Sequence, residues 1–323
     1  GISDTLCAPG HEEALPALTV DEPTVSMSFQ VNKSPFAGQD GKYLTSRQIR
    51  ERLDRELEHK VALRVDDTED PDKFRVSGRG ELHLAVLVET MRREGFELAV
   101  SRPEVIMHDV DGVEHEPWEQ LTVDFDEQYQ GAVMTRLAER KGELADMLPD
   151  GKGRIRLDYR IPTRGLIGFR TEYLTATSGT GLIYHVFEKY APRVGGAIAQ
   201  RNNGALVSNV QGKALAYALF NLQDRGRLFI GHGEPVYEGM IVGIHQRSND
   251  LIVNPTKAKQ LTNIRAAGSD ENLVLTPRLD YSLEQSLEFL DDDELLEVTP
   301  TNLRLRKKLL KETDRKRESR RAS

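Results

Sequence analysis

Cysteine is almost absent from this 323-residue sequence, which contains only Cys7. A single cysteine excludes an internal disulfide framework, and no cluster of cysteine and histidine has the spacing of zinc ligands. The sequence also lacks a run of about 18 apolar residues and a charged-then-apolar leader, so we expect neither a membrane span nor a secretory signal. Together these absences predict a cytoplasmic protein.

Short signatures of nucleotide binding and catalysis are missing as well. A phosphate-binding loop needs Ser or Thr after Gly-Lys, but Gly41-Lys42 precedes Tyr43, and no Gly-x-Ser-x-Gly turn is present. His232, between two glycines, is the most enzyme-like feature, although a structural histidine in a tight turn is the more frequent arrangement. The acidic run 291–294 lacks the central glycine of a calcium loop, and we interpret it as a solvated helix end. We therefore expect no catalytic, cofactor-binding or metal-binding residue in this chain.

The net charge of −8 is distributed unevenly. Residues 280–297 are acidic without any Lys or Arg, whereas 304–321 are strongly basic and 254–265 carry three cations and no acid. Such asymmetry between neighbouring segments is compatible with a nucleic-acid partner. A solvated acidic helix face followed by a disordered basic tail explains the same pattern.

Periodicity predicts the same order of elements twice. In the first module, Leu84, Leu87, Val88 and Met91 form one apolar helix stripe that ends at Gly95. Each module reads strand, helix, strand, strand, helix, strand, which is the split βαβ or ferredoxin-like order. In the first module we expect strands at 24–31, 61–65, 73–76 and 96–100, with helices from 45 or 46 and from 81. In the second module we expect strands at 121–125, 143–148, 154–161 and 182–190, with a helix through 129–137 and a single helix after Pro162.

The last third has short apolar runs cut by Gly, Asn and Asp, which is typical of a β-rich domain. One clear helix is expected near 283–290 and a strand at 297–305. Residues 213–222 are interpreted as a strand, although a buried helix also fits. The predicted fold class is α+β, with two ferredoxin-like split βαβ domains and a β-rich C-terminal domain. The expected segments are 1–23 (end of a preceding domain), 24–102, a linker at 103–116, 117–193, 194–310 and a basic disordered tail at 311–323.

Arginines recur near the strands and helix starts of both modules. Their guanidinium forks suit phosphate oxygens, as do free amides at helix starts. Pairing with neighbouring acids such as Asp66, Asp158 and Glu172 is an equally good interpretation. The arginines are Arg75, Arg79, Arg154, Arg156, Arg160, Arg164 and Arg170.

Several strings resemble a known group of proteins. Domain III of translational GTPases of the elongation factor G group resembles the string at residues 77–84, from Ser77-Gly78-Arg79-Gly80 to Leu84, together with 92–97 and 102–105. Domain V of the same group resembles 161–169, 178–181 and 187–190. Elongation factor G carries a large domain between these, where this chain has only a short linker. The last third is similar to the C-terminal domain of the BipA (TypA) family, at 222–226, 231–233, 236–239, 247–251 and 289–300. LepA is the alternative family within the same group of GTPases.

This resemblance implies a ribosome-binding GTPase that acts in stress adaptation and large-subunit assembly, here without its nucleotide domain. GTP and Mg²⁺ would bind in that missing domain, so this chain would hold no cofactor and hydrolyse nothing. Its implied partners are ribosomal RNA, the acceptor end of A-site transfer RNA and the GTPase domain in cis, and we expect a monomer. A stand-alone metabolic enzyme on a ferredoxin-like scaffold is the alternative from a different functional class.

The resemblance also directs attention to particular cations. The loop 254–270 is the segment expected to enter an RNA-lined space, with three of its cations as phosphate contacts. Arg79 is a secondary candidate, for RNA or for the missing nucleotide domain. The RNA-contact candidates are Lys257, Lys259, Arg265, Arg225, Arg247, Arg164 and Arg170.

Overall fold

A computed structural model of the chain describes residues 7, 9–10, 22–58, 60, 62–196, 198, 201, 203–259 and 273–322. By its internal contacts the chain divides into two compact units. The first contains Gly1–Val31, Gly41–Leu98 and Pro103–Gln200, and the second contains Asn32–Asp40, Ala99–Arg102 and Arg201–Ser323. The second predicted ferredoxin-like module and most of the first fall in the first unit, while 32–40 and 99–102 of the first module join the β-rich last third in the second unit.

The first module is built on an antiparallel sheet in which β3 pairs with both β1 and β2. β2 begins at Arg64 and not at 61 as predicted, because the Leu63 amide bonds the Lys60 carbonyl in a turn (3.3 Å) and Leu63 is buried before the strand starts. The elements are β1 (Val25–Gln30), α1 (Ser46–Leu57), β2 (Arg64–Asp67), β3 (Lys73–Gly78), α2 (Glu81–Arg93), β4 (Leu98–Val100) and β5 (Glu104–Val105), which pairs with β1.

Local sequence explains where the two helices of this module begin and end. Thr45 caps α1 in a capping box with Gln48, as the Thr45 or Ser46 start predicts. The predicted stripe of α2 is buried, and Gly95, with φ of +95°, ends that helix. A Cβ on Gly78 would lie 2.9 Å from His83 Nδ1, so this glycine lets α2 pack closely on β3. The apolar stripe is therefore the core contact of α2.

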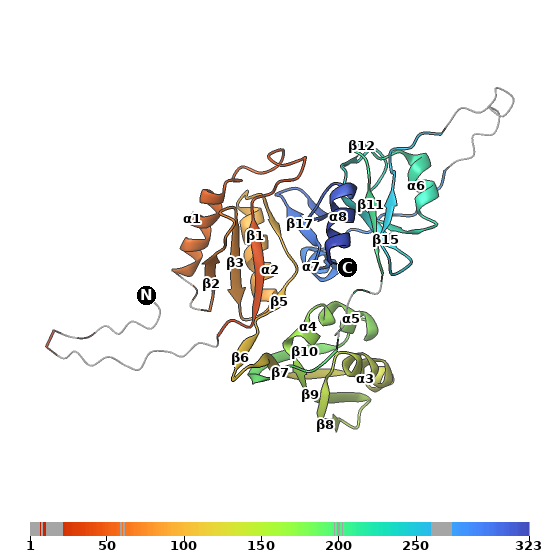
Figure 1. The fold of residues 1–323 in the computed structure, drawn as a ribbon. Coiled ribbons are helices and arrows are strands. Elements are labelled where there is room, and N and C mark those ends of the chain that lie inside the picture. The colour runs from red at the N-terminus through yellow and green to blue at the C-terminus, as the bar shows by residue number, and fades with distance from the viewer. Residues whose placement is uncertain are drawn as a thin grey trace. The chain divides into compact units, whose positions relative to one another are not determined.

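The second module is a five-stranded antiparallel sheet in which four strands follow the order β10-β7-β9-β8 and β6 pairs with part of β7, with its helices on one face (Figure 1). On that face Leu121, Val123 and Phe125 are fully buried against α3 and α5. A turn at Asp111-Gly112 joins β6 to β7, which starts earlier than the predicted 121. The elements are β6 (His108–Val110), β7 (Val113–Asp126), η1 (Glu127–Tyr129), α3 (Gln130–Glu139), β8 (Glu143–Pro149), β9 (Arg154–Pro162), α4 (Thr163–Leu166), α5 (Phe169–Ala176) and β10 (Leu182–Pro192).

The single helix predicted after Pro162 is wrong, because the chain breaks between α4 and α5. Gly168 has φ of +72° at the break. The buried guanidinium of Arg140 donates to the carbonyls of Gly165 (2.8 Å) and Ile167 (2.9 Å), which holds these carbonyls out of a continuous helix. Its second nitrogen bonds Glu172 (2.8 Å) on α5. A long-range arginine therefore decides this local break.

The second unit contains a four-stranded sheet in the order β13-β15-β11-β16, in which β11 and β16 are parallel, and a small pair, β12 with β14. Phe36 belongs to this unit and packs edge-to-face on Tyr237 at 5.0 Å. The elements are β11 (Ala205–Ser208), β12 (Gly212–Lys213), α6 (Ala216–Leu222), β13 (Gly226–Leu228), β14 (Pro235–Val236), β15 (Ile241–His245), β16 (Leu251–Val253), α7 (Leu283–Phe289), β17 (Glu294–Val298), β18 (Leu303–Lys307) and α8 (Glu312–Ala322).

Three predictions for the last third are wrong. Residues 213–222 are mostly the helix α6, since Ala218, Leu219 and Leu222 share its buried side. The strand predicted at 297–305 is a hairpin of β17 and β18, turned where the Thr299 amide bonds the Asn302 carbonyl (2.9 Å). The tail from 311 forms α8, with acids in its first turn and arginines in its last, as the helix dipole favours. The α+β class and the β-rich C-terminus are confirmed.

Candidate nucleic-acid interface

A cleft of about 750 Å³ lies in the second unit between α6 and β16. One wall comes from α6 and the turn that follows it, and the other from β16 and the residues after it. The lining residues are Tyr217, Ala218, Asn221, Leu222, Asp224, Arg225, Leu251, Ile252, Val253, Asn254 and Lys257. The cleft thus joins two segments about 30 residues apart in sequence, and it contains two of the predicted RNA contacts.

Arg225 stands in a tight turn whose backbone is fixed on both sides. Its amide bonds the Leu222 carbonyl (2.9 Å) at the end of α6, and its carbonyl accepts the Gln246 amide (3.0 Å). A Cβ on the next residue, Gly226, would lie only 1.8 Å from the Ile244 carbonyl oxygen, so only glycine fits there. The backbone of Arg225 is therefore rigid while its side chain is exposed.

Lys257 follows a second fixed turn on the other wall. The Asn254 side chain accepts the amide and the hydroxyl of Thr256, both at 2.9 Å, in an Asx turn. The Pro255 carbonyl accepts the Leu215 amide (2.9 Å), which ties this turn to the start of α6. Lys257 is exposed beyond it. Both cations thus project from backbone that is hydrogen-bonded to the same helix region.

The chemistry of this cleft suits a nucleic acid. Within the part of the chain that the structure describes, the side chains of Arg225 and Lys257 make no hydrogen bond or ion pair. Such cations remain available to phosphate oxygens. Tyr217 offers an aromatic ring for base stacking. The Asn221 side-chain nitrogen donates to the Tyr217 carbonyl (2.7 Å), so its amide oxygen is the group that can accept from a base edge. Asp224 is the one acid in the lining, so the balance of charge is positive.

Sequence reasoning missed Tyr217 and Asn221, and it included Asn254 only as the first residue of the candidate loop 254–270. The first two lie four residues apart and share one face of α6, a relation that the strand interpretation of 213–222 hid. The signal for Asn254 was present, because Asn-Pro-Thr favours a turn at this point. A helix assignment would have placed Tyr217 and Asn221 on the same face of α6.

The remaining candidates are placed differently. Arg247 is exposed in the turn between β15 and β16 and does not line the cleft, and Arg170 is exposed on α5. Arg164 bonds the fully buried Glu116 and the Gly196 carbonyl, so most of its donors are already used. Lys259 is exposed, and Arg265 lies outside the described residues. Arg79 is exposed at the turn before α2.

Other arginines of the second module are paired with acids. Arg154 bonds Asp124 (2.5 Å), Arg156 bonds Asp158 (3.1 Å), and Arg160 bonds Glu188. Of the two interpretations that the sequence left open, ion pairing therefore holds for these three.

His232 is structural, as expected: its Nδ1 accepts the Ala216 amide at 3.1 Å, in the first turn of α6. This bond satisfies one of the amides that a helix start leaves without an intrahelical partner. The imidazole therefore helps to fix α6 and the wall of the cleft that this helix forms.

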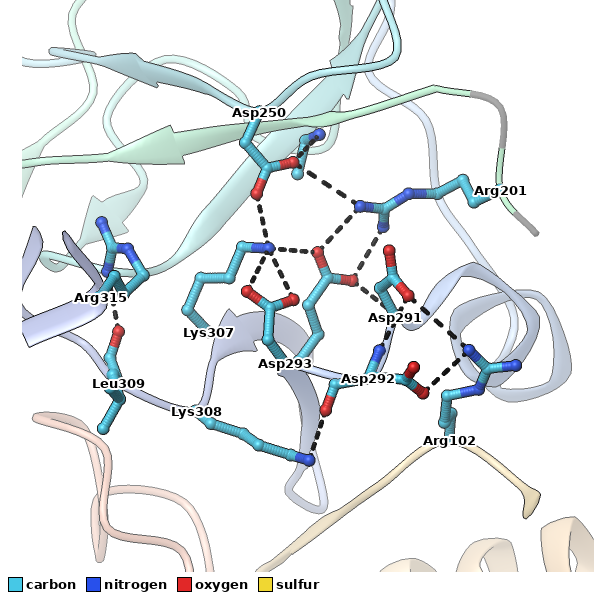
Figure 2. A network of polar contacts seen from close by, with 12 residues as sticks. Arg102, Arg201, Asp250, Asp291, Asp292, Asp293, Lys307, Lys308, Leu309 and Arg315 are labelled. Carbon is cyan, nitrogen blue, oxygen red and sulfur yellow. Dashed lines mark hydrogen bonds and ion pairs between the residues drawn. The ribbon is translucent and has the colours of Figure 1, made fainter. Parts of the chain in front are cut away.

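A dense charged cluster supports the base of β16 (Figure 2). Lys307 contacts Asp250 (2.6 Å), Asp293 (2.9 Å) and Glu294 (2.9 Å), while Arg201 bonds Glu294 through both terminal nitrogens. Burial alone would lower the pKa of Lys307, but the carboxylates, Glu294 foremost, outweigh it and raise this pKa. Asp250 precedes β16 directly, so the cluster joins β16 to the β17–β18 hairpin.

The same cluster corrects the interpretation of 291–294 as a solvated helix end. Glu294 is fully buried, and Asp292 pairs with Arg102 at 3.1 Å. Among the described residues no group of His, Cys, Asp and Glu is arranged to hold a metal ion. The acidic run instead neutralises cations from three segments of the unit.

Comparison with known proteins adds independent observations. Residues 203–312 match the family model described as the TypA/BipA C-terminal domain, and residues 113–201 match that of the elongation factor G C-terminus. Over 319 residues, or 99% of this chain, the sequence is 64% identical to the large ribosomal subunit assembly factor BipA of Salmonella typhimurium, and it covers 53% of that protein. The chain is thus similar to BipA proteins along almost its whole length, and its last third matches their C-terminal domain.

Two further BipA proteins show the same relation. The Haemophilus influenzae protein is 64% identical and the Buchnera aphidicola protein 56% identical, each over 99% of this chain. The chain spans about half the length of these curated relatives. The α6–β16 cleft lies wholly within the segment that matches the BipA C-terminal model, and the β10-β7-β9-β8 sheet lies within the segment that matches the elongation factor G model. The predicted BipA resemblance is confirmed. None of the described helices is long and apolar enough to cross a membrane.

Proposed function

We propose that this chain is the ribosome-binding part of a BipA-type GTPase and that it contacts RNA through the α6–β16 cleft. The single observation that carries the proposal is the pair of uncommitted cations, Arg225 and Lys257, that project from fixed turns on the two walls of this cleft. The name of its relatives, large ribosomal subunit assembly factor, supports a ribosomal partner.

In this proposal, residues 24–102 and 117–193 correspond to domains III and V of the elongation factor G group. The C-terminal domain, 194–310, carries the cleft and contacts ribosomal RNA and the acceptor end of A-site transfer RNA. GTP and Mg²⁺ bind in a part of the full-length protein outside this chain, which acts in the cytoplasm as a monomer in stress adaptation and subunit assembly. Lys259 and Arg265 extend the contact from the loop after β16, and Arg247 and Arg170 are secondary contacts.

Ribosome co-sedimentation over a salt titration tests the cleft. The double variant Arg225→Ala/Lys257→Ala should bind more weakly, and its salt slope should fall by about 1.4–1.8, because each lost phosphate contact removes roughly 0.7–0.9 from that slope. Lys152→Ala, which removes an exposed cation from the turn between β8 and β9, is the control and should leave the slope unchanged. An unchanged slope in the double variant would exclude the cleft as an RNA contact.

A further inference from the structure

The sheet of the second module has one face covered by helices and one face free. The register of its strands defines the free face, because directly paired residues point to the same side. Three transverse rows follow from this register. They are Leu182, Asp124, Arg156 and Leu148; Tyr184, Thr122, Asp158 and Asp146; and Val186, Gln120, Arg160 and Glu143.

The β10 end of these rows is apolar and exposed. Leu182, Tyr184 and Val186 have 63, 53 and 61% of their surface accessible, although their neighbours on β7 and β9 are mostly polar. Large apolar side chains aligned on one strand in this way mark a surface that gains from being covered. Because β10 is the last strand of the sheet order, this row also borders a backbone edge that no other described strand pairs with.

The two edges of the sheet differ in how they are protected. β8 has an irregular register between Leu144 and Asp146 and ends in Pro149, and both features discourage pairing with a further strand. β10 keeps a regular register from Leu182 to Phe187, and its irregularity comes only after that stretch. The stretch 182–187 is therefore an edge without the usual obstacles to strand addition.

Charge on the free face selects among classes of partner. Carboxylates outnumber guanidinium groups there, and the arginines are already paired, so a phosphodiester backbone would be repelled. Glu143 and Asp146 are exposed on β8, without a cationic ion-pair partner among the described residues. A second copy of this chain would match the apolar row but would bring the same excess of acid to the contact. A cationic partner matches both features.

We propose that β10 accepts an added β-strand from a partner protein, through the edge 182–187. The partner segment is extended, rich in lysine or arginine, and carries apolar residues at alternate positions. Its backbone continues the sheet beyond β10, its apolar side chains cover Leu182, Tyr184 and Val186, and its positive charge complements the acidic face. This surface is separate from the RNA cleft, which lies in the other unit.

Amide hydrogen exchange on the full 323-residue chain tests the proposal, with a peptide that alternates lysine and valine as the probe. Saturating peptide should slow exchange across 182–187 about tenfold or more, because edge amides become hydrogen-bonded. The same peptide N-methylated at alternate amides should give no protection, since it cannot form the ladder. Protection that survives N-methylation would contradict strand addition.

Variants separate this edge from the rest of the sheet. Val186→Lys places a like charge on the edge, and Tyr184→Ser removes apolar contact without adding charge; each should weaken peptide binding about tenfold or more. Leu148→Lys, at the β8 end of the Leu182 row, is the control and should bind normally. Three outcomes would each overturn the proposal. They are an equal loss of peptide affinity in all three variants, protection of 182–187 from amide exchange by a single-stranded RNA oligomer, and a dimer of this chain that Val186→Lys dissociates. Ribosome binding by the Arg225→Ala/Lys257→Ala protein is measured separately and does not enter this result.

Discussion

Lys307 shows how a single residue can hold three segments of the second unit together. Its side chain is 4% exposed and contacts three carboxylates, one of them the fully buried Glu294. Removing one partner of a buried ionic group leaves the other charges uncompensated, which typically costs about 3–5 kcal/mol. We therefore expect Lys307→Met to lower the free energy of unfolding by about this amount in a denaturant titration. Lys308→Met, at the exposed neighbouring position, should change it little; similar values for both variants would contradict a central role for Lys307.

His185 offers a second residue-scale prediction, in its dependence on pH. Its ring bonds the buried carboxylate of Glu119, which raises the pKa of His185 against the opposing effects of burial and of Arg170. A raised folded-state pKa means that the pair stabilises the fold fully below the unfolded value of about 6.5 and progressively less as pH rises through the folded value.

His185→Gln should therefore destabilise the protein more at pH 5.5 than at pH 8.5, as measured by chemical unfolding at both values. The control is His115→Gln on the same sheet, since among the described residues the His115 ring bonds only the Val113 carbonyl (2.9 Å). A cost of His185→Gln that is independent of pH would show that the ion pair does not contribute.

At the scale of elements, α2 depends on tertiary burial more than on its own propensity. Leu84, Leu87, Val88 and Met91 are all at most 1% exposed. Truncating a buried leucine removes transfer energy and leaves a cavity, so Leu87→Ala should cost about 2–5 kcal/mol in unfolding free energy. Leu82→Ala, on the exposed side of the same helix, is the matched control and should cost under about 0.5 kcal/mol. Comparable losses would mean that helix propensity, and not packing, holds α2.

At the scale of the whole molecule, the chain corresponds to about half of its relatives' length, and its described part contains the cleft proposed to bind RNA and the proposed strand edge. We expect GTP analogues with Mg²⁺ to leave the melting temperature of this chain unchanged, because a ligand stabilises only a fold that binds it. A thermal melt with increasing analogue measures this. A dose-dependent rise would refute the proposal that the nucleotide site lies elsewhere.

Much of the local structure could be predicted because burial follows short repeats in the sequence. The α2 stripe, its end at Gly95 and the start of α1 near Thr45 depend on residues within a few positions of one another. The candidate site was only partly predictable: the basic residues Arg225 and Lys257 were identified, but their place in one cleft was not. Residues 213–222 carry a pattern that fits strand and helix equally well, so the partners of α6 had to decide between them.

By itself, the sequence determined the two ferredoxin-like modules, the resemblance to BipA proteins and the absence of a disulfide framework, since these depend on local periodicity, motif strings and composition. The tertiary structure decided which arginines are paired, where Arg140 breaks a helix, which acids surround Lys307 and which strand is left as an open edge. The physical reason is distance along the chain. Ion pairs, clefts and sheet edges join residues tens of positions apart, and no local pattern specifies which of many possible partners will meet.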